Sequence, residues 1–147
     1  MPERYTDSIT ILETNIDDST GEMLGYVSER LFNAGAKDVF YSSIYMKKNR
    51  PAYKLTVICG DDLKEIMEDI IFEETTAIGI RARSENRTCL GREIKEVETA
   101  YGPVKVKCVY TRKGRRLYPE FDSARKIAEK FSVPLCEVYA EVSKAEK

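Results

Sequence analysis

Between residues 7 and 84, the apolar residues change their spacing in a fixed order: strand, helix, two strands, helix and strand. Alternating apolar residues are typical of a half-buried strand, and apolar residues three and four positions apart are typical of a helix. These segments are residues 8–12, 23–32, 38–46, 53–59, 60–72 and 77–83. The order predicts an α+β fold, in which a ferredoxin-like βαββαβ antiparallel sheet carries two helices on one face.

The remainder of the chain, residues 85–147, follows a different pattern. Two extended runs separated by a turn with Gly102 and Pro103 predict a β-hairpin, and two prolines stand where C-terminal helices begin. The hairpin strands are expected at 88–99 and 104–110, a basic turn at 112–116, and the helices from Pro119 and Pro134. We expect this hairpin and two-helix extension to form one structural unit with the 7–84 core.

Composition excludes several classes of protein. The 147 residues include no histidine, which removes catalytic triads that depend on histidine and metal sites that depend on imidazole. The net charge of -1 argues against a general polyanion binder. No apolar run is long enough to cross a membrane, and the start of the chain has no signal-peptide core, so we expect a cytoplasmic protein without membrane partners.

An acidic turn, residues 13–22, joins the first expected strand to the first expected helix. Two interpretations stay open. Ser19 and Glu22 have the spacing of a capping box, which would make the turn a helix cap. Capping leaves Glu13, Asn15 and Asp17 unexplained, whereas a hard divalent cation with substrate phosphates would use such carboxylates.

Two further segments could complete a site for a metal–nucleotide. Residues 47–51 hold three cations and an amide on a loop stiffened by Pro51, which suits a triphosphate; the alternative is solvated surface. Residues 73–81 place hydroxyls before Gly79, where a ligand could approach the backbone; the alternative is a polar loop with a packing glycine. Pro119–Asp122 is interpreted as an acidic first turn of a helix. Walker-type, Rossmann and catalytic-serine motifs are absent from the sequence.

Taken in order, these motifs resemble the C-terminal domain of the LarC family, the nickel-insertion proteins that complete the nickel-pincer nucleotide cofactor of lactate racemase. The resemblance covers nearly the whole chain. It rests on Glu13-Thr14-Asn15-Ile16-Asp17-Asp18 with Gly21-Glu22, Met46-Lys47-Lys48-Asn49-Arg50-Pro51, Glu74-Thr75-Thr76-Ala77-Ile78-Gly79-Ile80-Arg81 and Pro119-Glu120-Phe121-Asp122.

The resemblance implies a CTP-dependent cyclometallase of the lyase class. It would bind CTP with Mn²⁺ or Mg²⁺ and insert Ni²⁺ into pyridinium-3,5-bisthiocarboxylic acid mononucleotide. We expect a homo-oligomer that binds CTP but needs the family's larger N-terminal region for the full reaction. CTP and phosphate contacts are assigned to Lys47, Lys48, Arg50, Thr75, Thr76 and Arg81; metal contacts are assigned to Glu13, Asp17, Asp18 and Glu22. No catalytic residue is assigned.

Two alternatives come from other functional classes. A βαββαβ sheet with basic edges is also the shape of an RNA-recognition module, although the glycine–aromatic signature is absent and nucleic acid is therefore not the expected partner. An oligomerising domain that senses a small molecule without turnover is the second alternative. An aromatic pair on the central strands would favour RNA binding.

Overall fold

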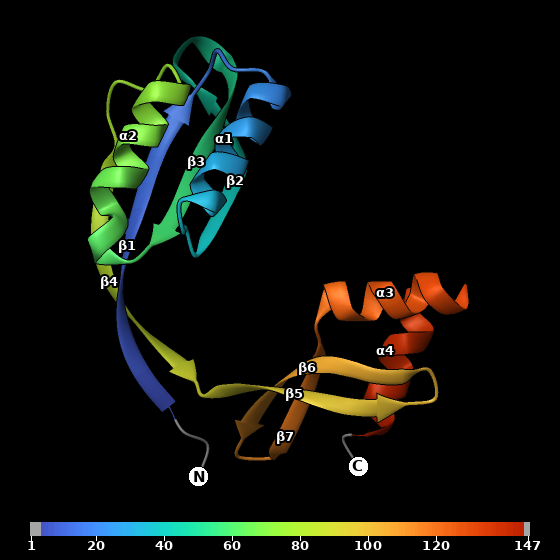
Figure 1. Ribbon diagram of the computed structural model, residues 1–147. Coiled ribbons are helices and arrows are strands. Elements are labelled where there is room, and N and C mark those ends of the chain that lie inside the picture. Colours follow the sequence, from blue (N-terminus) through green and yellow to red (C-terminus); the bar gives the residue numbers. More distant parts are fainter. Residues whose placement is uncertain (1–3, 146–147) are drawn as a thin grey trace. The chain divides into compact units, whose positions relative to one another are not determined.

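The computed structural model describes residues 4–145, whose contacts fall into two compact units (Figure 1). The first unit runs from Thr6 to Arg87, and the second takes in the rest of the described chain. That the two act as one structural unit stays a prediction. Within the described residues, no helix is both long and apolar enough to cross a membrane.

The first unit has the predicted ferredoxin-like topology. Its sheet has the order β2-β3-β1-β4, and β3 runs antiparallel to both β1 and β2. Two helices, α1 and α2, contribute to one core with this sheet (Figure 1). The elements are β1 (Arg4–Ile16), α1 (Gly21–Asn33), β2 (Asp38–Met46), β3 (Arg50–Cys59), α2 (Lys64–Glu74) and β4 (Arg81–Leu90), with short 3-10 turns at Lys47–Asn49 and Asp61–Leu63.

The core of the first unit follows from the two periodicities. Leu12 of β1 lies opposite Val57 of β3, and both are fully buried beneath the helices. Helix α1 contributes Val27 and Leu31, which are four residues apart and equally buried. Each such side chain stabilises the fold by about 1.5–3 kcal/mol relative to its exposed state. The helical stripes therefore fix which face of the sheet is covered.

The second unit packs two helices against a three-stranded antiparallel sheet of order β5-β6-β7. Along β6, Val104, Val106 and Cys108 are fully buried, as the alternation of that segment predicts. Ala124 of α3 and Val138 of α4 complete the same core. The elements are β5 (Arg92–Thr99), β6 (Gly102–Thr111), β7 (Gly114–Pro119), α3 (Phe121–Phe131) and α4 (Leu135–Lys144).

The basic turn expected at 112–116 is wrong in its extent, because residues 114–119 form strand β7. The chain reverses at Arg112 and Lys113, and residues 114–119 then pair with β6, beginning at Gly114, whose φ of +122° suits glycine. Leu117, opposite Cys108, is the buried residue of this strand at 7% exposure. A strand with one inward apolar residue among exposed arginines carries too little alternation to be detected from sequence.

Strand β4 also lies later than expected. Residues 77–80 form a loop rather than the start of the strand predicted at 77–83, and β4 continues to Leu90. Gly91 then separates β4 from β5, so the run expected at 88–99 belongs to two strands. Most of β4 is exposed and polar, because it lies at the edge of the sheet order. Backbone pairing has outweighed side-chain propensity there.

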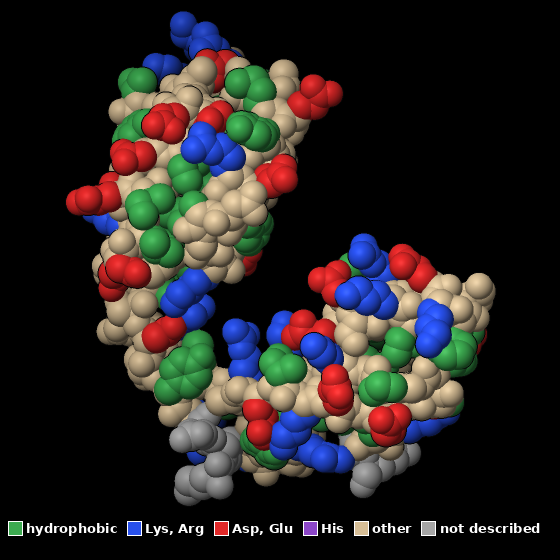
Figure 2. All heavy atoms as spheres, in the orientation of Figure 1, with side chains coloured by type: hydrophobic (Ala, Val, Ile, Leu, Met, Phe, Trp, Pro, Cys, Tyr) green, Lys and Arg blue, Asp and Glu red, His purple; other side chains and the backbone are tan. Residues whose placement is uncertain are grey.

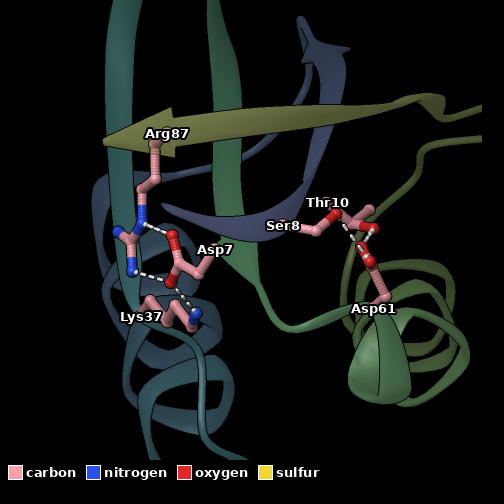
Figure 3. A network of polar contacts seen from close by, with 6 residues as sticks. All are labelled: Asp7, Ser8, Thr10, Lys37, Asp61 and Arg87. Atoms are coloured by element: carbon pink, nitrogen blue, oxygen red, sulfur yellow. Dashed lines mark hydrogen bonds and ion pairs between the residues drawn. The ribbon is translucent and has the colours of Figure 1, made fainter. Parts of the chain in front are cut away.

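Two carboxylates fasten the beginning of β1 to its neighbours (Figure 3). Arg87 of β4 donates two hydrogen bonds to Asp7, at 2.7 and 2.8 Å, and Lys37 donates a third at 3.2 Å. Asp61, before α2, accepts from the hydroxyls of Ser8 and Thr10 at 2.8 and 2.6 Å. The Thr10 and Ser8 hydroxyls hold the pKa of Asp61 below its ordinary value.

Candidate functional site

Three separately predicted segments meet at one end of the sheet in the first unit. Arg50, which begins β3, donates a hydrogen bond to Asp17 at 3.3 Å. The hydroxyl of Thr76, in the loop after α2, donates a short hydrogen bond to Asp18. Asp17 and Asp18, which follow β1, are therefore each held by one side chain, a guanidinium and a hydroxyl. The sequence predicted both of these groups for the same site as the two aspartates.

A ladder of polar pairs continues from this turn along the sheet. Strand residues two apart share a face, so Glu13 and Asn15 lie on the same side of β1. Arg81 of β4 donates to the Asn15 amide oxygen at 2.9 Å, and Arg83 donates to Glu13 at 3.0 Å. Two arginines of the edge strand thus follow two acceptors of β1 in register.

Glu13 does not join Asp17 and Asp18 in a metal site. Four strand residues span about 13 Å, which is far more than two ligands of one ion allow. The Glu13 side chain is 14% exposed and is also paired with Lys54 at 3.3 Å. The hydrogen bond from Arg83 holds the pKa of Glu13 below its ordinary value, with Lys54 acting in the same direction. The Glu13 carboxylate is therefore ionised, and its charge is balanced by Arg83 and Lys54.

The four predicted metal ligands consequently do not form a cluster. Among residues 4–145, no group of three or more Asp, Glu or Cys side chains is arranged to hold a metal ion. Glu22, the last residue of the acidic segment, lies in the first turn of α1, whereas Glu13 lies within β1. Asp17 and Asp18 are the two carboxylates that the turn presents together, and any cation there would need its remaining ligands from a substrate or water.

The cap of α1 differs from the expected capping box. Thr20, not Ser19, is the N-cap, and its hydroxyl accepts the Met23 N–H at 3.3 Å. The Ser19 hydroxyl is buried and has no hydrogen-bond partner among the described residues. Because Thr20 caps the helix, neither aspartate of the turn is needed for that purpose.

The loop between β2 and β3 is shorter than the predicted 47–51 segment. Arg50 and Pro51 already pair with Met46 and Tyr45, so only Lys47–Asn49 lie outside the ladder. Lys48 and Asn49 both have left-handed backbones, with φ of 62° and 57°. This conformation is uncommon for lysine. Lys and Arg side chains gather at this end of the unit (Figure 2).

The loop of residues 75–80 is anchored on both sides. Thr75 donates its hydroxyl hydrogen to Ile71 O at 2.7 Å and accepts the Ala77 N–H at 3.1 Å, so its hydroxyl is committed to ending α2. Thr14 of β1 donates to Gly79 O at 2.8 Å, a contact that nothing in the local sequence indicates. A Cβ added at Gly79 would meet nothing within 4 Å, so packing does not require glycine there.

Apart from Glu22, which lies in the first turn of α1, the predicted site residues separate into three groups. Asp17, Asp18, Arg50, Thr76 and Arg81 are linked by the contacts at the end of β1 and its polar ladder. Lys47 and Lys48 stand on the adjacent β2–β3 loop and form no ion pair in the described part of the chain. Glu13 and Thr75 have their side-chain oxygens engaged elsewhere.

The chain is similar in sequence to several known proteins. A family described as nickel insertion protein matches residues 2–139. A pyridinium-3,5-bisthiocarboxylic acid mononucleotide nickel insertion protein of Alkaliphilus metalliredigens is 51% identical over 91% of this chain and 32% of its own length. A protein of the same name from Acetivibrio thermocellus is 47% identical over 97% of this chain and 35% of its own. The chain spans about a third of the length of these curated relatives.

A solved structure is similar over nearly its entire length. It is apo LarC2, described as the C-terminal domain of a cyclometallase involved in the synthesis of the NPN cofactor of lactate racemase, and it superposes with a TM-score of 0.91 at 40% identity. The match covers 96% of this chain and 98% of that one. Protein MK0293 from Methanopyrus kandleri is a more distant match, with a TM-score of 0.66 and 26% identity.

Proposed function

The chain belongs to the nickel insertion protein family, and from this we propose that it is the part of a nickel-inserting cyclometallase that binds CTP together with Mn²⁺ or Mg²⁺. The observation that carries the proposal is a pair of contacts at the end of β1: Arg50 donates to Asp17, and Thr76 donates to Asp18. Carboxylates, a guanidinium and a hydroxyl thus lie together at this end of the sheet, which we call the rim. These are the groups that a metal-bridged triphosphate requires.

The donor set at the turn fits a hard cation that arrives with phosphates. Mg²⁺ and Mn²⁺ commonly use one or two carboxylates and take their other ligands from water and substrate phosphates. Asp17 and Asp18 supply that number. Their present partners, Arg50 and Thr76, would be released by the cation and become available to phosphate oxygens.

The basic residues of the rim would balance the remaining charge. CTP carries roughly four negative charges, and one divalent cation cancels two. Arg50 can hold two phosphate oxygens through its planar fork, and Lys47 and Lys48 have no competing ion pair in the described chain. We assign the distal phosphates to this loop, and we assign Arg81, which donates to Asn15 of β1, to the same ligand.

In the full reaction, nickel is the metal that is transferred and the pyridinium mononucleotide is its acceptor, as the relatives' names state. Imidazole is a favoured nickel ligand, and this chain has no histidine, so an imidazole ligand would have to come from elsewhere. We therefore assign nucleotide binding to this chain and completion of the reaction to the longer protein. Self-assembly of the chain stays a prediction.

A thermal-shift panel tests the proposal directly. Melting would be followed with CTP, ATP, GTP and UTP, each with and without Mn²⁺, because a ligand that binds only the folded state raises the melting temperature. We expect a rise with CTP that depends on Mn²⁺ and disappears in Asp17→Asn and Asp18→Asn. Asp62→Asn is the matched control, because Asp62 lies in the 3-10 turn before α2, at the other end of that helix from Thr76. Equal rises for all four nucleotides, or none, would overturn CTP selectivity.

The geometry gives little support to the RNA-binding alternative. Tyr41 and Tyr53 pack edge to face, with ring centroids 6.5 Å apart, and the Tyr41 hydroxyl donates to Leu24 O of α1 at 2.7 Å. This pair therefore lies on the helix-covered face of the sheet. Phe40 lies on strand β2 at the edge of the sheet order. RNA-recognition sheets stack bases on aromatic residues of their open face.

A further inference from the structure

A cavity of about 550 Å³ opens in the second unit, between the first turns of α3 and strands β5 and β6. Its volume lies within the range of pockets that enclose small ligands. Charged side chains of both signs surround α3 on the visible face of this unit (Figure 2). The residues that matter to the argument are Ile94, Lys105, Glu120, Asp122, Lys126 and Ile127.

The walls of this cavity are joined through the backbone of one residue. The Lys105 N–H donates to the Ser123 hydroxyl at 3.0 Å, and the Lys105 carbonyl accepts the Glu120 N–H at 2.8 Å. Both backbone groups of a β6 residue thus hold the beginning of α3 in place. The cavity is consequently formed before any ligand arrives, which lowers the entropic cost of binding.

Its charges are unevenly neutralised. Lys107 pairs with Glu120 at 3.0 Å, so that carboxylate is balanced. In the part of the chain that the structure describes, no ion pair engages Lys105, Lys126 or Asp122. The cavity therefore offers two uncommitted cations and one uncommitted anion. The start of α3 also has no side-chain cap, and the N–H groups of a helix's first turn generally favour a phosphate.

The remaining surface is apolar. Ile94 of β5 lines the cavity and is 57% exposed, so its side chain is accessible to a ligand there. Ile127 of α3, which is half-buried, also lines the cavity. Two branched aliphatic side chains provide a contact surface for a flat ring. Polar groups that fix orientation over such a surface are the usual composition of a ligand site.

We propose that this cavity binds a phosphate monoester attached to a planar cationic ring, with the phosphate at Lys105 and Lys126 and the ring against Ile94 and Ile127. Asp122 compensates the positive charge of the ring. A pyridinium mononucleotide has this chemistry, so the inference rests on the proposed function and gives the acceptor of nickel a place on this chain. The site is distinct from the CTP site, which is formed by residues of the first unit alone.

Nicotinic acid mononucleotide is a suitable probe, since it carries a pyridinium ring, a carboxylate and a phosphate monoester. Calorimetry on the 147-residue chain should show binding, and each of Lys105→Met and Lys126→Met should weaken it about tenfold, the loss of one charge-assisted contact. Lys130→Met is the matched control, because Lys130 also lies on α3 but stacks on Phe131 at 5.3 Å outside the cavity. The corresponding riboside, which lacks the phosphate, should bind weakly and equally to all variants.

The outcomes separate this inference from the proposed CTP site. Binding of the probe that persists in both lysine variants, or no binding to the parent chain, overturns the inference even if CTP binds. Loss in Lys126→Met with unchanged CTP affinity supports it. A second variant, Ile94→Asp, tests the ring contact: it should weaken the mononucleotide while inorganic phosphate binding is retained. Equal weakening of both ligands would contradict the proposed placement of the ring.

Discussion

Arg50 Nη1 lies 3.3 Å from Asp17 Oδ2, so the first residue of β3 is tied to the turn that follows β1. The pair is partly exposed, with side-chain exposures of 53% and 24%. An exposed ion pair of this kind contributes little to stability and is easily exchanged for another partner. We interpret it as a contact that gives way when a metal-bridged phosphate binds.

Replacing Arg50 with lysine should weaken CTP binding although the charge is kept. Lysine presents a point charge and cannot hold two phosphate oxygens in the planar geometry of a guanidinium. Calorimetry against CTP and CMP with Mn²⁺ measures the effect, with Arg116→Lys in the second unit as control. The loss should be larger for CTP than for CMP. An equal loss for both ligands would move Arg50 to the base or the sugar.

Thr14→Val should make the loop of residues 75–80 more mobile without leaving a cavity in the core. Threonine and valine have the same shape, but valine cannot donate to Gly79 O, which now accepts at 2.8 Å from a residue that is 3% exposed. The free energy of unfolding should fall by about 1 kcal/mol, as for other single hydrogen bonds. Hydrogen exchange of residues 75–80 should rise more than that of α1. Uniform exchange changes would contradict a local role.

Thr20→Ala and Ser19→Ala form a matched pair at the start of α1. Removing the Thr20 hydroxyl, which accepts the Met23 N–H, should cost about 1 kcal/mol of stability. Removing the Ser19 hydroxyl, which is buried without a partner, should leave stability unchanged or increase it. Urea unfolding of both variants measures the difference. A greater loss in Ser19→Ala would restore the capping box expected from the sequence.

Because of Asp7, the free energy of unfolding should fall as the pH is lowered. The hydrogen bonds from Arg87 hold the pKa of Asp7 well below its ordinary value, with Lys37 acting in the same direction. A carboxyl with a depressed folded-state pKa stabilises the fold above its unfolded pKa, and this contribution is lost as pH falls through the folded value. Asp7→Asn should therefore lose stability at neutral pH and show a flatter decline in acid.

The comparison must be made with the parent chain at each pH, because Glu13 and Asp61 also have depressed pKa values and contribute in the same acidic window. Urea titrations between about pH 7 and pH 2 provide the two curves. If the curves stay parallel, the Arg87 contact does not govern the ionisation of Asp7.

Strong periodicity explains what the sequence could predict. The stripe of Leu24, Val27 and Leu31 located α1, and the alternation of Val104, Val106 and Cys108 located β6, because burial is specified on one face in each case. Strand β7 has only Leu117 on its inner face, and β4 is a polar edge, so backbone pairing defines them more than side chains do.

The composition of these segments suggested a candidate site, but the contacts between them could not be predicted from the sequence. Nothing in the local sequence shows that Thr76 reaches Asp18 across 58 positions, because that contact depends on the sheet order. The same limit applies to Glu13, which the sequence grouped with Asp17 because both are acidic. The alternation and rise of a strand separate them, and the arginines of β4 then take up Glu13. Ser19 and Thr20 are both good N-caps, so local preference could not choose between them.

The position of Arg87 has a practical consequence for dissecting the chain. The sequence suggested a boundary after Ser84, yet the guanidinium that holds both oxygens of Asp7 lies three residues further on. A fragment that ends at Ser84 would contain most of the sheet but would lack Arg87, and with it the two hydrogen bonds that hold the beginning of β1. A fragment that continues through Leu90, where β4 ends, retains the Arg87–Asp7 contact.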